Sequence, residues 1–115
     1  LQLRLTADSL RTTGRDSAAA GMAFVQLGVE YESKLDARQA ARAFEQASAL
    51  AAATGDSVTL ADALQKLGLL YWRVNQYERS LEFLERAKAL RMALGDRQAL
   101  ARVLNNIGAS YYQLG

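Results

Sequence analysis

The apolar residues of this chain recur at spacings of three and four over most of its length. In the segment Ser17–Lys34 they are Ala20, Phe24, Leu27 and Tyr31, and after Asp56 they are Leu60, Leu64, Leu67, Tyr71 and Val74. This spacing places apolar side chains on one face of an α-helix. The pattern continues over Ala37–Thr54, from Tyr77 to Leu90 and from Leu100 to Tyr111, and predicts a helix in each segment.

Short polar or glycine-containing breaks separate these segments. Leu35-Asp36 and Asn75-Gln76 are predicted turns, and Gly14-Arg15-Asp16 is predicted to break the helix there. Asp16, Asp56 and Asp96 each precede a helical segment, where an Asp side chain can accept hydrogen bonds from free backbone N–H groups. Gly55 and Gly95 precede two of these caps, at a position where helix ends favour left-handed backbone angles.

The breaks and stripes repeat at a fixed interval of forty residues. Phe24–Tyr31, Leu64–Tyr71 and Leu104–Tyr111 share a large apolar residue, an aliphatic residue, Gly and Tyr at one spacing. Such a period indicates a solenoid of stacked supersecondary units. We therefore predict a single domain over 1–115 with about six helices. Residues 1–13 are the second helix of a preceding repeat, 16–54 and 56–94 are full repeats, and 96–115 is the first helix of a further one.

The repeat resembles the tetratricopeptide repeat (TPR) family. Its pattern is carried by Phe24, Leu27, Gly28, Tyr31, Ala40, Phe44 and Ala47, then by Leu64, Leu67, Gly68, Tyr71, Ser80, Leu84 and Ala87, and lastly by Leu104, Ile107, Gly108 and Tyr111. The resemblance implies an all-α solenoid of antiparallel helical hairpins in a right-handed superhelix. Two departures stand out, since the usual terminal Pro is absent and the period is longer than the family's 34 residues.

Composition narrows the chemistry that the chain can perform. It contains no His and no Cys, and therefore lacks the commonest general base, the strongest side-chain nucleophile and any disulfide. We expect neither an enzyme nor a cofactor or metal site. Fourteen basic and 12 acidic residues are interspersed, without the clustered basic face that nucleic-acid binding usually needs. No apolar run approaches the roughly 20 residues of a membrane span, and Arg4 and Asp8 interrupt the first ten residues, so we expect a cytoplasmic protein.

The family resemblance implies a binding groove on the concave face, which the first helix of each repeat lines. The predicted groove residues are Val25, Val29, Asp62, Gln65, Lys66, Leu69, Trp72, Arg73, Arg102, Asn105, Asn106, Ala109 and Tyr112. Aromatic residues beside Arg and Asn are typical of interface hot spots. The Lys and Asn arrangement that clamps a carboxylate in chaperone-binding members is not reproduced here.

Three functions compete on this evidence. The preferred one is a non-catalytic protein- or peptide-binding scaffold within a larger, bacterial regulatory or signalling protein. The alternative is a regulatory or linker segment of a multidomain enzyme, such as a sensor kinase, that packs internally and binds no partner in trans. RNA binding would require a consistently basic groove, which Glu32 and Asp62 oppose.

The two ends of the chain expose apolar stripes in this arrangement. The apolar face with Leu104, Ile107 and Tyr111 is expected to pack against a second helix, which is missing after it. The first segment lacks the helix that should precede it. Exposed apolar stripes of this size mark association sites. We therefore expect the chain to self-associate through its uncapped terminal helices.

Overall fold

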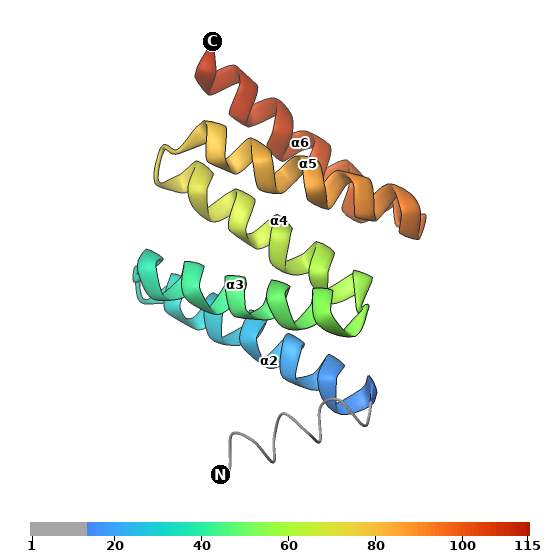
Figure 1. Ribbon diagram of the computed structural model, residues 1–115. Helices are drawn as coiled ribbons and strands as arrows, with labels where there is room; N and C mark the ends of the chain where they lie inside the picture. The colour runs from blue at the N-terminus through green and yellow to red at the C-terminus, as the bar shows by residue number, and fades with distance from the viewer. Residues whose placement is uncertain (1–13) are drawn as a thin grey trace.

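The computed structural model describes the backbone of residues 14–115 and the side chains of residues 19–115. This part of the chain consists of five α-helices joined by short turns, without a strand (Figure 1). They are α2 (Gly14–Ser33), α3 (Ala37–Thr54), α4 (Ser57–Arg73), α5 (Tyr77–Leu94) and α6 (Arg97–Leu114). The predicted all-α class is confirmed. The helix expected over 1–13 lies outside the described residues.

Local sequence signals explain where the helices start and stop. The Asp56 and Asp96 side chains accept hydrogen bonds from Thr59 N at 3.1 Å and Ala99 N at 3.2 Å, as predicted for N-caps. Gly55 and Gly95 end the preceding helices with φ near +72° and +71°, the left-handed region that a residue without a Cβ enters most easily. The predicted caps and helix ends at these two junctions are confirmed.

The first junction differs from the prediction. Helix α2 already begins at Gly14, so Asp16 lies inside its first turn and is not its N-cap, and no break separates residues 14–16 from the helix that follows. At the other two junctions a Gly directly precedes the Asp, whereas Arg15 precedes Asp16. The Gly-Asp pair found at Gly55-Asp56 and Gly95-Asp96 is therefore missing at this point.

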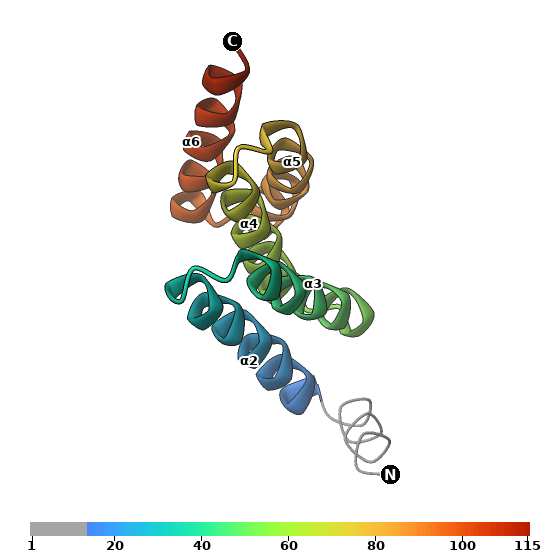
Figure 2. The ribbon, with the colours of Figure 1, turned by 90° about the vertical axis from the view of Figure 1, so that its left-hand side faces the viewer.

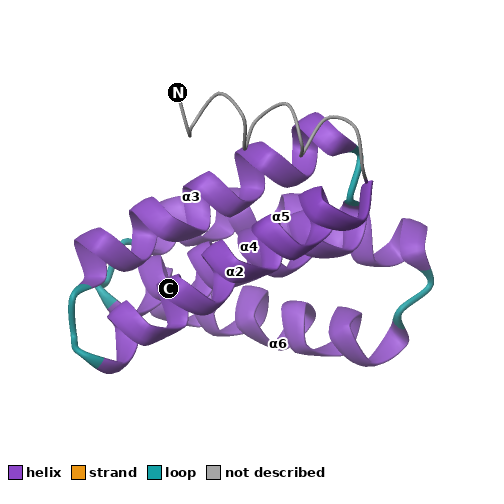
Figure 3. Cartoon of the chain, turned by 90° about the horizontal axis from the view of Figure 1, so that it is seen from below, coloured by secondary structure: helices purple, strands orange, loops and turns teal. Residues whose placement is uncertain are grey.

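The helices form two layers. In Figure 2, α2, α4 and α6 lie on one side of the molecule and α3 and α5 on the other. Each helix packs against the next one in the chain, and α4 additionally contacts α2 and α6 (Figure 1). The view along the stack in Figure 3 shows the turns at the two ends of the layers. Contacts are therefore made mainly between neighbours in sequence.

Two glycines allow the paired helices to approach closely. A Cβ placed on Gly28 of α2 would overlap the Phe44 ring of α3, and a Cβ on Gly68 of α4 would come within 2.5 Å of Leu84 Cδ2 of α5. Real Cβ atoms do not tolerate such distances without repacking. The absence of a side chain at these two positions therefore lets α3 lie close to α2 and α5 close to α4.

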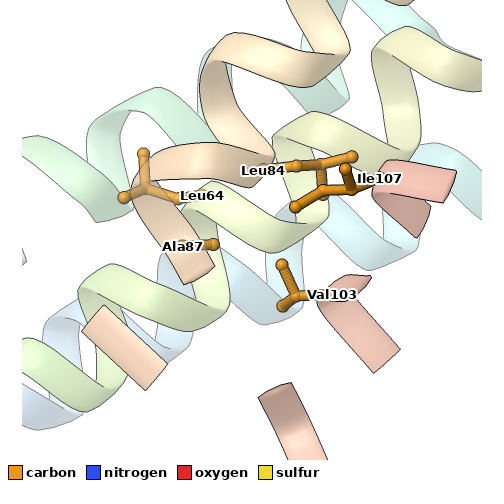
Figure 4. Close-up of a cluster of buried hydrophobic side chains, with 5 residues drawn as sticks. All are labelled: Leu64, Leu84, Ala87, Val103 and Ile107. Atoms are coloured by element: carbon orange, nitrogen blue, oxygen red, sulfur yellow. The ribbon is translucent and has the colours of Figure 1, made fainter. Parts of the chain in front are cut away.

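The apolar interior follows the helix stack in two clusters. One joins α4, α5 and α6 through Leu64, Leu84, Ala87, Val103 and Ile107 (Figure 4). The other joins α3 and α4 through Ala40, Phe44, Leu67 and Leu70. Every side chain of both clusters is at most 8% exposed. Because each cluster spans consecutive helices, the apolar interior stabilises the contacts between neighbouring helices. We call each such contact a joint.

Candidate binding surface

The predicted groove residues belong to α2, α4 and α6, which form one layer of the molecule (Figure 2). We refer to the surface that they line as the α2–α4–α6 face. An ion pair crosses it, with Arg73 Nη1 of α4 donating to Glu32 Oε2 of α2 at 2.8 Å. The Glu32 side chain is 14% exposed and that of Arg73 is 54% exposed. This contact shows that corresponding ends of α2 and α4 meet on the same face.

The α2 part of the face serves the interior of the fold. Val25 and Val29 are half-buried and pack against the apolar cluster that contains Phe44 and Leu67. Their methyl groups help to join α2 to the helices behind it. Both valines were predicted to line the groove, and in the structure they contribute to this helix contact.

Two of the predicted groove residues of α4, Asp62 and Gln65, contact the Arg91 side chain. Arg91, on α5, is 4% exposed. Its guanidinium pairs with the Asp62 carboxylate, and its Nη2 donates to Gln65 Oε1 at 3.3 Å. A third partner is the Asp96 carboxylate, 3.8 Å from Nη1. Asp62 and Gln65 therefore hold α4 to α5, and their side chains are directed at another helix rather than only at solvent.

The remaining α4 residues keep partial access to solvent. Lys66, Leu69 and Trp72 are all half-buried. The indole Nε1 of Trp72 is itself buried and has no hydrogen-bond acceptor among the described residues. An indole N–H is a donor only, and its burial without an acceptor costs free energy, so donation to an acceptor that reaches this atom would be favourable.

Helix α6 presents the most open part of the face. Tyr112 is 83% exposed, and Arg102 and Asn105 are exposed nearer the start of the helix. Asn106 and Ala109 complete the predicted set on this helix, and Asn106 is half-buried. Tyr112 stands at the position held by Trp72 in α4 and by Glu32 in α2, forty and eighty residues earlier. A phenol, a guanidinium and a carboxamide are thus displayed together on one helix surface.

The exposed side chains of α6 offer hydrogen-bond donors and aromatic area. Among residues 19–115, no group of three or more acidic, His or Cys side chains is arranged to hold a metal ion. The donors of Arg102 and Asn105 suit peptide carbonyl oxygens or carboxylates, and the Tyr112 ring offers apolar area with a polar hydroxyl. None of the described helices is both long and apolar enough to cross a membrane.

A hollow that the sequence did not predict lies between α3 and the turn that joins α4 to α5. It encloses about 620 Å³ and is lined by Arg38, Arg42, Glu45, Tyr71 and Arg79, among others. The Arg79 guanidinium carbon lies 5.0 Å from the centroid of the Tyr71 ring. One sequence signal points to it, because α3 carries Arg38 and Arg42 where α5 carries Glu78 and Glu82 forty residues later.

Comparison with known proteins does not assign the chain to a family. No protein-family model matches it, and no match was found among curated proteins.

Proposed function

We propose that the chain is a non-catalytic module that binds a peptide or protein segment on the α2–α4–α6 face. Its helical hairpins would form a solenoid of the tetratricopeptide type with a right-handed superhelix, within a larger regulatory or signalling protein. The proposal depends above all on the exposed Tyr112, which stands one repeat after the half-buried Trp72 on the same face. Large aromatic side chains with polar tips contribute strongly to protein interfaces.

The residues around this aromatic pair suit an extended ligand. Asn105 is exposed and Asn106 is half-buried, and a carboxamide can both donate to and accept from a peptide backbone. Arg102 and Lys66 supply positive charge along the same face. The ligand favoured by this combination is a peptide segment with an apolar anchor and a carboxylate nearby.

A second candidate is an internal linker segment of a multidomain enzyme that binds nothing in trans. It is favoured by the five groove residues that already have partners within the chain, one of which is Arg73, paired with Glu32. Val25 and Val29 pack inward, and Asp62 and Gln65 hold Arg91. The two candidates differ at α6, because only the binding module needs Tyr112 and Asn105 for its function.

The experiment is a selection of peptides from a random library against the immobilised chain, followed by titration of individual peptides. Trp72 is the only tryptophan, so its fluorescence reports events on this face. We expect selected peptides to shift the Trp72 emission. We also expect Tyr112→Ala and Asn105→Ala to weaken binding about tenfold each, the scale of an interface hot spot. Met92→Ala is the matched control, because Met92 is 60% exposed on α5, in the other layer.

Two outcomes would refute the binding module. If Tyr112→Ala binds every selected peptide as tightly as the unaltered chain does, the α2–α4–α6 face is not the binding surface. If no peptide is selected while a pool of single-stranded RNA binds at low salt and dissociates as salt is raised, the ligand is nucleic acid.

A further inference from the structure

The hollow between α3 and the α4–α5 turn has an excess of positive charge. Three arginine side chains line it, Arg38 and Arg42 from α3 and Arg79 from α5. Glu45 is the one acidic residue among its described lining residues, so positive charges exceed negative ones by two. The ion pairs found between described residues are all made by other basic side chains. Within residues 19–115, the charge of the three guanidiniums is therefore not neutralised by close pairing.

The hollow lies inside the stack and not at one of its ends. Its walls come from α3, from the end of α4 and from the start of α5, and these helices are flanked by α2 and α6 (Figure 2). It opens on the layer of α3 and α5, whereas the α2–α4–α6 face is on the other layer. The two surfaces are therefore separate, and the inference below does not depend on the proposed function.

Arg79 is held in place without a carboxylate. Its guanidinium carbon lies 5.0 Å from the centroid of the Tyr71 ring. The Tyr71 ring in turn stacks on that of Phe83, with centroids 5.5 Å apart and an angle of 6° between the ring planes. A guanidinium that lies over an aromatic ring keeps its N–H groups available to an oxygen acceptor. Because the side chain is already ordered, less conformational entropy is lost when an anion binds it.

Two of the arginines stand at the positive ends of helices. Arg38 is the second residue of α3 and Arg79 is the third residue of α5. The N-terminus of a helix carries partial positive charge, which disfavours a basic side chain in the first turn and attracts an anion. The first turn of α3 contains no acidic residue. An anion in the hollow would therefore be attracted by the guanidiniums and by both helix ends.

The repeat itself does not require these positive charges. Forty residues after Arg38 and Arg42, the same positions of α5 hold Glu78 and Glu82. The helical hairpin therefore forms with either sign of charge at these positions. The positive charge of the hollow is specific to the joint between α3 and α4, which suggests a role in binding and not in folding.

We propose that this hollow binds a phosphorylated side chain of a peptide segment. A phosphate monoester carries a charge of about −1.5 to −2 at neutral pH, which matches the excess of two positive charges better than a single carboxylate does. Guanidinium groups can donate two parallel hydrogen bonds to phosphate oxygens. The volume of about 620 Å³ is typical of a site for a ligand larger than one phosphate group, and leaves room for the residues beside it.

The test compares labelled peptide pools that differ at one residue. Two pools carry a fixed phosphoserine or phosphotyrosine between randomised uncharged residues, and matched pools carry Ser, Tyr or Glu at that place. Each is titrated against the full 115-residue chain and followed by fluorescence anisotropy. We expect one phosphorylated pool to bind about tenfold or more tightly than the Glu pool, because a phosphate offers more charge and more acceptors. The Ser and Tyr pools should not bind.

Substitutions in the hollow identify the side chains that hold the phosphate. Arg42→Gln and Arg79→Gln should each weaken binding about tenfold. Arg79→Lys should also weaken it, since lysine keeps the charge but loses the planar group that lies over Tyr71. Glu45→Gln should tighten binding about threefold, because it removes the negative charge of the lining. Arg86→Gln is the matched control, since Arg86 is exposed on the same helix as Arg79 but lies outside the hollow.

Two further variants separate the hollow from folding and from the other surface. The double variant Arg38→Glu/Arg42→Glu should abolish binding, and circular dichroism should show it folded, because α5 has Glu at both positions. Tyr112→Ala should leave phosphopeptide binding unchanged, since Tyr112 is on α6, in the other layer. A failure of the hollow can thus be distinguished from a failure of the α2–α4–α6 face.

Four results would overturn the proposal. If the Glu pool binds as tightly as both phosphorylated pools, the hollow is a carboxylate site. If Arg86→Gln weakens binding as much as Arg42→Gln and Arg79→Gln do, the peptides respond only to overall charge. If inorganic phosphate displaces the bound pool at the concentration of the pool itself, the ligand is free phosphate. If single-stranded RNA binds more tightly than any peptide pool and loses affinity in the same arginine variants, the ligand is nucleic acid.

Discussion

The hydroxyl oxygens of Ser80 and Ser110 lie 3.2 Å apart in the buried joint between α5 and α6. Ser80 Oγ also lies 2.6 Å from the Gly68 carbonyl oxygen, to which it donates. Ser110 is then the donor to Ser80, because a hydroxyl has a single hydrogen to give. Forty residues earlier, the same positions hold Ala40 and Leu70, both in the apolar cluster between α3 and α4. The contact between α5 and α6 thus contains a hydrogen-bonded hydroxyl pair where the corresponding positions between α3 and α4 hold apolar side chains.

The hydroxyl pair should behave as a unit. We expect Ser80→Ala to lower the free energy of unfolding by about 1–2 kcal/mol, since it leaves the buried Ser110 hydroxyl without its acceptor. The double variant Ser80→Ala/Ser110→Ala should cost less than the sum of the single changes, because neither hydroxyl is then left unpaired. Urea unfolding of the four proteins measures the coupling. Strictly additive losses would contradict it.

Gly68 should reject a side chain that Gly108 accepts. Gly68→Val drives its methyl groups into Leu84 and should cost about 2 kcal/mol or more by overpacking. Gly108→Val meets no atom in the described chain and should change the free energy of unfolding by less than about 0.5 kcal/mol. Thermal melts of the two variants test the difference. Equal losses would show that the helix spacing at Gly68 is not set by Leu84.

Leu35 is strained relative to Asn75, the residue at the same place in the next repeat. Both have positive φ, +59° and +66°, and Leu35 is 92% exposed. An L-residue with a long side chain resists this conformation more than Asn does. Leu35→Asn should therefore raise the free energy of unfolding by about 0.5–1 kcal/mol, with little packing lost. The reciprocal Asn75→Leu should lower the free energy of unfolding, and chemical denaturation measures both variants. If both are stabilised, or both are destabilised, the strain assigned to Leu35 is contradicted.

The two ion pairs of α4 should differ in strength. Asp62→Ala removes a partner from the buried Arg91 guanidinium and should cost about 1–2 kcal/mol, a value reduced from that of a fully buried pair because Asp62 is itself 46% exposed. Glu32→Ala removes the partner of the exposed Arg73 and should cost less than about 1 kcal/mol. Raising the salt concentration should reduce the stability loss of Glu32→Ala by a larger fraction than that of Asp62→Ala. Denaturant titrations at low and high salt provide the comparison.

The sequence predicted the helices and most of their ends because these depend on neighbouring residues. Apolar spacing gives the helical face, and a Gly-Asp pair gives both the end of one helix and the cap of the next. Gly55-Asp56 and Gly95-Asp96 follow this rule. The Asp36 cap of α3, whose carboxylate accepts from Gln39 N, was missed because Leu35 rather than Gly precedes it.

The surface was harder to predict, because spacing does not show which neighbour a half-exposed residue touches. Val25 and Val29 lie off the main apolar stripe, and they pack inward because α4 lies beside α2. Arg91 joins α5 to Asp62 across 29 residues of sequence. Its counterpart in the preceding repeat is Ala51, so the periodic pattern gave no sign of a buried charge.

Because the helices contact mainly their neighbours, the joints of the stack stand in series along its length. A pulling force applied at the two ends of the described chain has to separate each helical hairpin from the next, and no extensive contact between α2 and α6 shares the load. Within that part of the chain, the joint between α3 and α4 has no counterpart of the Ser80–Ser110 hydrogen bond or of the Arg91 guanidinium. Under tension the molecule would therefore lengthen in steps, and the α3–α4 joint would open before the joint between α5 and α6.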